Sequence, residues 1–257
     1  MNPGAITSSI DVAQVTLYLF WIFFAGLLIY LRREDKREGY PLEEADAAPE
    51  TLREGFPGRA APKTFILPHG GVSVRPVEWV PGARPPINAI PTGPWPGAPL
   101  EPTGDPLLAG VGPGSWANRP DEPDLTLDGQ PKIVPLRADA EYGIDARDPD
   151  PRGKEVRGAD GAVGGKVVDV WVDRSERHFR YLEVEVAGGR RVLLPVNFTT
   201  VGADGSVKVR AILGAQFAGV PGLRNPAQVT LLEEEKITAY YGAGTLYAEP
   251  SRAEPWL

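Results

Sequence analysis

Carboxylate side chains are the residues of this 257-residue chain best suited to chemistry, because cysteine is absent and histidine occurs only twice. Acids gather in two stretches, at residues 121–128 and at residues 173–176. Clustered carboxylates raise one another's pKa and can pass protons inward through water. A solvated acidic face, which fits the net charge of −7, is the first interpretation, and a proton-collecting surface is the alternative. The acids concerned are Asp121, Glu122, Asp124, Asp128, Asp173 and Glu176.

The other residue types exclude several kinds of site. Without cysteine the chain has no disulfide, thiolate metal site or cysteine nucleophile. His69 and His178 lie far apart in the sequence, so a multi-histidine metal site or a Ser-His-Asp triad has little material, and a tethered hydrolase is a weak hypothesis. The negative charge argues against nucleic acid as a partner. We therefore predict neither catalytic residues nor a cofactor or metal site in this chain.

An apolar run near the N-terminus predicts a permanent membrane anchor. Residues 12–31 carry no charge, and a helix of this length spans roughly 30 Å, the thickness of bilayer hydrocarbon. Residues 1–11 contain no Lys or Arg, whereas four basic residues follow the run between positions 32 and 37. The positive-inside rule then predicts an N-terminus outside and a cytoplasmic remainder. A cleaved signal peptide would need basic residues before the run and a small-residue cleavage site after it, and neither is present.

The predicted span offers no chemistry of its own. It contains no His, Asp, Glu or Lys, so it has no strong axial ligand for haem iron or chlorophyll magnesium and no proton-carrying side chain in the membrane. If the protein works in membrane chemistry, other chains must hold the cofactors.

The segment that follows the span is predicted to be irregular. Residues 38–120 are rich in proline and glycine with little periodicity, and residues 85–106 show no pattern of regular structure. Large apolar residues nevertheless recur in this segment, and in an irregular chain such residues usually lie on a partner surface. They are Phe65, Ile66, Leu67, Trp79, Trp95 and Trp116.

From about residue 131 the pattern changes to short strands. Residues 165–173 alternate, which places Asp169, Trp171 and Asp173 opposite the valines, and residues 179–187 alternate again. Gly188-Gly189 and Asp204-Gly205 are hairpin signals, so an antiparallel meander forming a small barrel is expected. Residues 230–248 predict one helix, with Thr230 as N-cap and a first turn rich in acids. Gly242 and Gly244 are expected to weaken its end.

Several blocks of this sequence, in order and spacing, resemble one family, the H subunit of the photosynthetic reaction centre of purple bacteria. The blocks are FWIFFAGLLIYL, REGYPLE, KTFILPHG, PTGDPLLAGVGPGSW, GKVVDVWVD, YLEVEV and VTLLEEEKI followed by YGAG. The barrel resembles the PRC-barrel module. The resemblance implies a subunit that binds the L and M subunits, caps their quinone side and conducts protons to the secondary quinone. Bacteriochlorophyll, bacteriopheophytin, quinones and non-haem iron would all lie in those partners.

The resemblance also gives roles to individual residues. Asp173 and Glu176 match family positions implicated in proton delivery or in the electrostatics near the secondary quinone. Asp124 matches an acid of the same inner cluster, and Arg180 matches a basic residue close to these acids. Two surface histidines that form the proton entrance in the family correspond here to Asp128 and Gln130. Asp128 can still collect protons, whereas a glutamine cannot titrate.

The sequence thus predicts a single N-terminal transmembrane α-helix, a mainly-β cytoplasmic domain with a PRC-barrel-like antiparallel small barrel, and one C-terminal helix. The predicted divisions are a periplasmic N-terminus (1–11), the span (12–31), an extended segment lying on partner subunits (32–130), the barrel domain with its helix (131–248) and a tail (249–257). We expect an inner (intracytoplasmic) membrane location, with membrane lipids and light-harvesting ring subunits as further partners. The alternative is a membrane-tethered adaptor whose barrel binds a soluble protein or a ribonucleoprotein.

Overall fold

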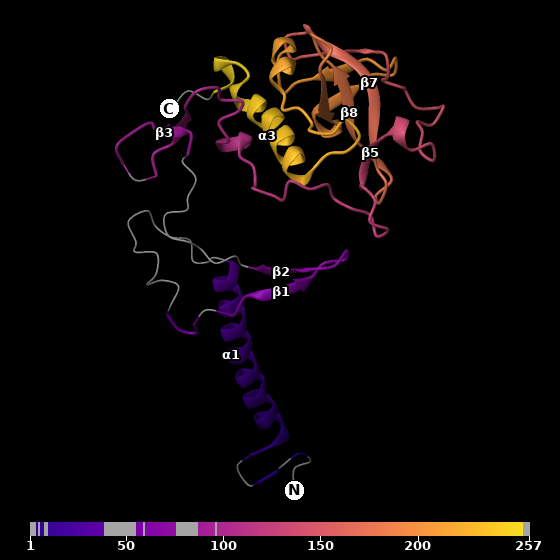
Figure 1. Ribbon diagram of the computed structural model, residues 1–257. Coiled ribbons are helices and arrows are strands. Elements are labelled where there is room, and N and C mark those ends of the chain that lie inside the picture. Colours follow the sequence, from indigo (N-terminus) through magenta and orange to yellow (C-terminus); the bar gives the residue numbers. More distant parts are fainter. Residues whose placement is uncertain are drawn as a thin grey trace. The chain divides into compact units, whose positions relative to one another are not determined.

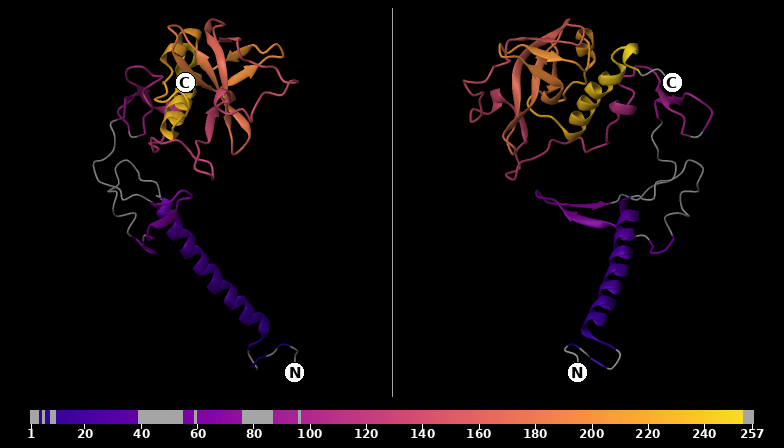
Figure 2. Two further views of the ribbon diagram at one scale, coloured as in Figure 1. Left: turned by 45° about the vertical axis from the view of Figure 1, so that its right-hand side comes forward. Right: turned by 180° about the vertical axis from the view of Figure 1, so that it is seen from behind.

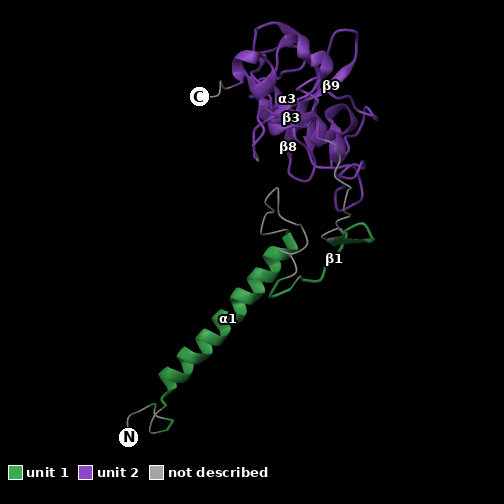
Figure 3. Cartoon of the chain, turned by 90° about the vertical axis from the view of Figure 1, so that its left-hand side faces the viewer, with its two compact units in different colours: residues 1–84 green, residues 85–257 purple. Residues whose placement is uncertain are grey.

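The computed structural model describes residues 4, 6–7, 10–38, 55–58, 60–75, 87–95 and 97–253. Contacts within the chain divide it into two compact units, Met1–Arg84 and Pro85–Leu257 (Figure 3). The first unit holds a long helix and one hairpin, and the second holds the sheet and the C-terminal helix (Figure 1). Each unit is described separately below.

Helix α1 is the long apolar helix of the first unit and runs from Val12 to Glu38. Its start is capped by Asp11, whose Oδ1 accepts a hydrogen bond from the backbone N–H of Gln14 at 2.7 Å. By length and composition the helix can cross a membrane. The helix continues beyond the predicted span, as far as Glu38. An ion pair of 3.0 Å between Glu34 and Arg37, at i,i+3 spacing, stabilises these last turns.

Two short hairpins correct the prediction of irregular chain between residues 38 and 120. In the first unit β1 (Lys63–Ile66) pairs antiparallel with β2 (Val72–Arg75). In the second unit β3 (Ala89–Pro91) pairs antiparallel with β4 (Leu100–Pro102), inside the stretch where no regular structure was expected. Each strand is only three or four residues long, and prolines occupy strand ends, where a missing N–H donor is tolerated. Proline-rich composition therefore masked the pairing. The predicted contacts of Trp79 lie outside the described residues.

The second unit is built on one curled seven-stranded sheet, with neighbours in the order β10-β11-β6-β7-β8-β9 and β5 paired with β7 (Figure 2). Most pairs are antiparallel, as the predicted meander requires, but β11 and β6 run parallel. The strands are β5 Ile133–Pro135, β6 Glu155–Arg157, β7 Val163–Asp173, β8 His178–Glu185, β9 Arg191–Pro195, β10 Thr199–Val201 and β11 Val207–Val209. Both predicted turns are confirmed, at Gly188-Gly189 between β8 and β9 and at Asp204-Gly205 between β10 and β11.

The central strand β7 is buried more completely than its alternating sequence indicates. Both of its faces are buried over the second half of the strand, and the polar Asp169 and Asp173 are buried with the valines. Register shifts near Val168 and after Trp171 interrupt the simple alternation. Burial of these carboxylates is possible because each is hydrogen-bonded; Asp169, for example, accepts bonds from the backbone N–H and the guanidinium of Arg137.

A second buried carboxylate, Glu183 on β8, lies beside the same arginine. It accepts a hydrogen bond of 2.9 Å from the indole N–H of Trp171 and pairs with the guanidinium groups of Arg137 and Arg191. Cation and hydrogen-bond partners of this kind offset the cost of removing the carboxylate from water. This network ties β7, β8 and β9 to the short 3₁₀ helix η2 (Leu136–Ala138).

Helix α3 (Leu231–Tyr247) confirms the predicted C-terminal helix and covers the sheet (Figures 1 and 2). Thr230 caps its N-terminus in a reciprocal capping box with Glu233. The ring of Tyr241 is fully buried against Phe198 and Phe217. The remaining 3₁₀ helices are η1 Gly112–Gly114, η3 Val196–Phe198, η4 Gly214–Gly219 and η5 Pro250–Arg252.

The two glycines near the end of α3 have a packing role, and the helix continues past both. A Cβ atom at Gly242 would lie 2.4 Å from the carbonyl oxygen of Pro113, and one at Gly244 would lie 2.5 Å from that of Ala211. The absence of side chains therefore lets α3 approach η1 and the chain before η4 closely.

Candidate functional site

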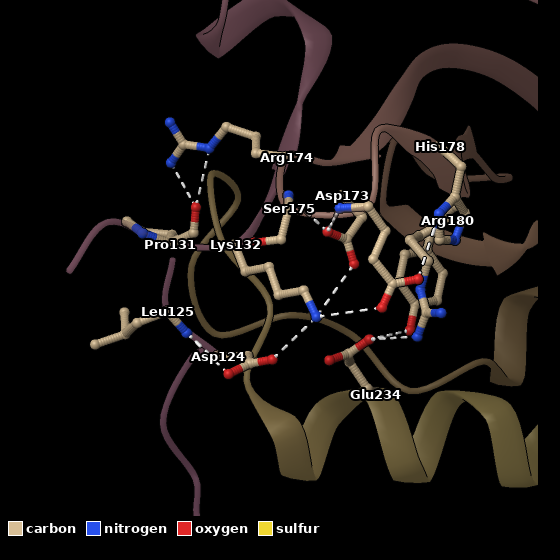
Figure 4. A network of polar contacts seen from close by, with 12 residues as sticks. Asp124, Leu125, Pro131, Lys132, Asp173, Arg174, Ser175, His178, Arg180 and Glu234 are labelled. Carbon is tan, nitrogen blue, oxygen red and sulfur yellow. Dashed lines mark hydrogen bonds and ion pairs between the residues drawn. The ribbon is translucent and has the colours of Figure 1, made fainter. Parts of the chain in front are cut away.

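A pocket of about 460 Å³ lies beside the first turns of α3 and the ends of β7 and β8. Several side chains with formal charge face it, and Figure 4 shows them converging from four separate parts of the second unit. A liquid water molecule occupies about 30 Å³, so the pocket has room for several. The charged lining residues used below are Asp124, Lys132, Asp173, Arg180 and Glu234.

A tight turn brings the first two of these residues together. The backbone N–H of Lys132 donates to the carbonyl oxygen of Asp124 at 2.8 Å, and that of Thr126 donates to Gln130 at the same distance. Leu125 and Pro131 form an isolated β-bridge across the base of this turn. Residues 124 and 132 are thereby held opposite each other, and both side chains reach the pocket (Figure 4).

Lys132 is the centre of the cluster. Its Nζ lies 3.5 Å from Oδ2 of Asp124, 3.5 Å from Oδ2 of Asp173 and 3.8 Å from Oε1 of Glu176 (Figure 4). Burial lowers the pKa of Lys132, but attraction and hydrogen bonding from Asp173 and Asp124 outweigh burial and raise the pKa above its usual value of 10.5. The ammonium group is therefore a fixed positive charge among three carboxylates.

Asp173 is the most deeply buried of these carboxylates, at the end of β7. Its side chain is only 2% exposed. Besides the ammonium of Lys132, its Oδ1 accepts hydrogen bonds from the backbone N–H groups of Ser175 and Glu176, at 2.9 and 3.0 Å. This arrangement caps the turn between β7 and β8 and gives the buried carboxylate three donors in place of water. Glu176 follows three residues later, in the turn after β7. Its side chain is largely exposed, so the group of acids around Lys132 extends from the interior to the surface.

Glu234 approaches the same pocket from the first turn of α3. Its Oε2 accepts a hydrogen bond of 2.6 Å from the hydroxyl of Tyr181 and lies 3.7 Å from the guanidinium of Arg180. Burial raises the pKa of Glu234, an effect that the Tyr181 hydrogen bond and the charge of Arg180 reduce without cancelling. Glu234 is thus the carboxylate of the cluster that is suited to hold a proton above the normal range.

Two further groups lie at the edge of the cluster. Nδ1 of His178, at the start of β8, is 3.8 Å from Oε2 of Glu176. Both side chains are substantially exposed, so they stand where the cluster meets solvent. Arg180, two residues along the strand from His178, is inside the pocket with Glu234.

Of the five residues singled out from the sequence, Asp124, Asp173 and Arg180 line the pocket. Glu176 is outside the lining, but its carboxylate lies 3.8 Å from the ammonium of Lys132. The fifth, Asp128, lies in the exposed turn between Thr126 and Gln130 and is outside the pocket lining. Asp121, from the same acidic stretch, instead binds Arg224 and accepts a hydrogen bond of 2.8 Å from the hydroxyl of Thr230 at the start of α3.

Sequence reasoning missed Lys132, Glu234 and the placement of His178. Lys132 lies in the stretch LDGQPKI, in which only Asp128 and Gln130 were considered as proton-entry positions. Glu234 belongs to an acidic helix start, which the helix dipole explains without any further role. No local signal singles out Lys132, because seven basic residues lie between the two acidic stretches.

Possible metal ligands form no comparable cluster among the residues that the structure describes. Within the described ranges of the chain, no group of three or more His, Asp or Glu side chains is placed so as to hold a metal ion.

One apolar membrane-crossing helix, joined in sequence to a curled β-domain with a covering helix, defines a membrane-anchored PRC-barrel protein. Comparison with family models agrees, since residues 144–212 match the PRC-barrel domain. Residues 4–138 match the model for the photosynthetic reaction centre, H-chain N-terminal region. The chain belongs to the photosynthetic reaction centre H-chain family. It is a structural subunit of a photosynthetic reaction centre and associates with the core of that complex.

Proposed function

We propose that this subunit caps the quinone side of the L and M subunits and conducts protons from the cytoplasm to the secondary quinone. The observation that carries the proposal is the cluster at the pocket in which the ammonium of Lys132 lies within 3.8 Å of an exposed acid, Glu176, and of a buried one, Asp173. The redox groups, namely bacteriochlorophyll, bacteriopheophytin, quinones and non-haem iron, belong in this proposal to the partner subunits.

The membrane orientation follows from the charges at the ends of α1. Basic residues follow the apolar run at once, and residues 1–11 have none. The second unit is therefore cytoplasmic and the N-terminus periplasmic. In this orientation the acidic pocket stands on the side from which protons are taken up.

The proton route begins at the exposed edge of the cluster. There the exposed imidazole of His178 lies 3.8 Å from the carboxylate of Glu176. The carboxylates of Glu176, Asp124 and Asp173 all lie within 3.8 Å of the Lys132 ammonium group, so they form one cluster that extends from the surface to the interior. Glu234, with its raised pKa, is the proton-holding group on the α3 side of the pocket. Asp128 is left as a proton collector on the turn outside the pocket.

The test is the substitution Glu176→Gln in the intact reaction centre, with the second electron transfer to the quinone followed by flash spectroscopy across pH. A positioned acid–base group typically contributes about 100-fold or more, but neighbouring carboxylates remain here, so we expect slowing on the order of tenfold. Primary charge separation is expected to be unchanged. Glu185→Gln is the matched control, because Glu185 is an exposed carboxylate at the far end of β8 and outside the pocket. Unchanged kinetics at every pH would remove Glu176 from the route.

The adaptor alternative predicts different binding behaviour. It requires a second unit that binds a soluble partner by itself, with the preceding Pro/Gly-rich segment dispensable. Membership of the H-chain family favours the reaction-centre function over this alternative.

A further inference from the structure

Residues 112–123, called the strap below, lie along α3 and run in the direction opposite to the helix. Near the end of α3, a Cβ atom added at Gly112 would lie 3.0 Å from the hydroxyl of Tyr247. At the start of α3, the backbone N–H of Leu231 donates to the carbonyl oxygen of Glu122 at 2.9 Å. The strap therefore follows the helix from its end to its start and stops directly before the acid cluster.

Glu235 holds the middle of the strap on the helix. Its Oε1 lies 2.8 Å from Nε of Arg119, and its Oε2 accepts a hydrogen bond of 3.1 Å from the backbone N–H of Ala117. The ammonium of the next residue, Lys236, lies 4.9 Å from the centre of the Trp116 ring. The side chain of Arg119 is half exposed, so its ion pair adds little stability by itself. What the three contacts do together is fix the position of the strap on α3.

A glycine allows the strap to touch the helix directly beside these contacts. A Cβ atom at Gly114 would lie 2.7 Å from Cβ of Ala243 and 3.5 Å from the carbonyl oxygen of Ala239. Carbon atoms in contact are about 3.5–4.0 Å apart, so any larger residue at position 114 would separate the strap from the helix.

The strap and α3 together form one wall of the 460 Å³ pocket. Pro113, Ser115 and Arg119 line the pocket from the strap, and Glu234 and Thr238 are among the residues that line it from the helix. The intervening strap positions 114 and 116 instead line a second cavity of about 140 Å³. The contact between strap and helix therefore separates the pocket from this smaller cavity.

This wall lies outside the part of the chain that matches the PRC-barrel domain. The strap falls within residues 4–138, and α3 begins after residue 212, where the barrel match ends. The pocket therefore depends on a contact between two segments that flank the barrel in the sequence.

We propose that the strap closes the pocket to water on the side of α3, and that Glu235 is the positioning residue that keeps it closed. Solvent then reaches the acids at the edge where Glu176 is exposed. The closed wall contributes to the burial of Glu234, and burial is the largest cause of its raised pKa. Entry of protons at Glu176 rests on the proposed function, whereas closure of the pocket does not.

The first variant of the intact reaction centre opens the strap without changing any charge. Gly114→Ala adds a methyl group that overlaps with Ala243, so the strap or the helix must shift. Gly143→Ala is the matched control, because a Cβ atom at Gly143 would meet nothing within 4 Å and the residue is outside the pocket lining.

A second pair of variants separates the contacts of Glu235 from its charge. Glu235→Ala and Glu235→Gln both remove the negative charge, but the glutamine keeps an oxygen that can accept from the N–H of Ala117. A difference between these two variants therefore reports the contact with the strap and not the lost charge.

Hydrogen–deuterium exchange of the intact complex, followed by mass spectrometry, shows whether the strap opens. We expect the amides of residues 114–119 to exchange about tenfold faster in Gly114→Ala and Glu235→Ala, and more slowly in Glu235→Gln than in Glu235→Ala. Gly143→Ala should leave their exchange unchanged. Unchanged exchange in Glu235→Ala would overturn the role of Glu235, and unchanged exchange in Gly114→Ala as well would overturn the strap.

Infrared pH titration shows whether water then enters the pocket. The reporter is the protonated-carboxyl band of Glu234, assigned by its loss in Glu234→Gln. Its midpoint should fall toward 4.5 in Gly114→Ala, because water reduces the burial that raises the pKa. The other groups that act on Glu234 keep their charges: Tyr181, Arg180, Asp124 and Lys132.

The same titration tests Glu235, whose removal should lower the midpoint further in Glu235→Ala than in Glu235→Gln. Faster exchange of the strap in Gly114→Ala with an unchanged or raised midpoint would overturn the exclusion of water. Neither measurement uses electron transfer. Failure of the strap proposal is therefore distinguishable from failure of proton conduction, which the kinetics of Glu176→Gln test.

Discussion

At the scale of single residues, the surroundings of each ionisable group decide its role. Asp173 and Glu234 are carboxylates of one pocket that differ in their partners. Asp173 is buried, accepts two backbone N–H bonds and faces the ammonium group of Lys132. Burial is the largest influence on the partly exposed Glu234 and raises its pKa. One site therefore holds a buried acid surrounded by donors and a second acid prepared to bind a proton.

The raised pKa of Glu234 makes a prediction for pH. A proton binds more tightly in the folded state than in the unfolded state, where the ordinary value is 4.5. This group's contribution to the free energy of unfolding therefore falls as pH rises from 4.5 to the folded pKa. Infrared pH titration of the intact complex should show a protonated-carboxyl band with a midpoint above 4.5.

The substitution Glu234→Gln should remove this band, and the amide keeps an oxygen that can accept from Tyr181. Glu185→Gln, which changes an exposed carboxylate, should leave the band in place. A band that survives Glu234→Gln would assign the proton to another group.

At the scale of elements, short connections bring the site together. The turn at residues 126–130 sets Asp124 opposite Lys132, and the end of β7 presents Asp173. Helix α3 contributes Glu234 from its first turn, so the position of that turn matters to the pocket. Thr230 fixes it twice: its hydroxyl oxygen accepts from the backbone N–H of Glu233 and the hydroxyl donates to Asp121.

We predict that Thr230→Ala lowers the free energy of unfolding by about 1–2 kcal/mol, the usual loss for an N-cap threonine. The measurement is denaturant unfolding of the detergent-solubilised full chain, monitored by circular dichroism. Thr245→Ala is the matched control, because Thr245 is within the same helix and its hydroxyl bonds only one turn back, to Gly242. Alanine is the better helix former there, so we expect a change within about 0.5 kcal/mol. Equal losses in both variants would contradict the capping role.

At the scale of the whole molecule, the chain divides into an anchoring unit and a sheet unit. This division fits a structural subunit that is attached to a larger membrane complex. The anchor has a helix suited to cross a membrane, and the sheet unit carries the acidic pocket. Membership of the H-chain family gives the pigment-bearing core as the partner.

The partner prediction is tested by affinity purification of this chain from mild-detergent membranes of photosynthetically grown cells. We expect bacteriochlorophyll and bacteriopheophytin absorption in the purified material, with bands that bleach reversibly in light. A colourless preparation, while the complex stays intact in the membrane, would contradict the proposed L and M partners and favour the adaptor alternative.

Local features of the sequence were sufficient for much of the fold. The uncharged run at residues 12–31 predicted the membrane helix, because length and polarity alone decide whether a segment can cross hydrocarbon. Thr230 and Glu233 predicted the start of α3, since a capping box involves residues three apart. Gly188-Gly189 and Asp204-Gly205 predicted two hairpins for the same local reason. The short strands β3 and β4 were not predicted, because the proline-rich composition of this stretch indicated irregular chain.

Clustering in the sequence singled out the acids of the site and the family resemblance gave them roles, but the tertiary structure decided how they are arranged. Lys132 contacts Asp173 and Glu176 across some forty residues of chain, and Glu234 reaches the pocket from a helix still further along. No sequence period encodes such distances. Burial of both faces of β7 likewise depends on neighbours that are remote in sequence. Since a pKa is set by spatial neighbours and burial, the raised pKa of Glu234 exists only in the folded chain.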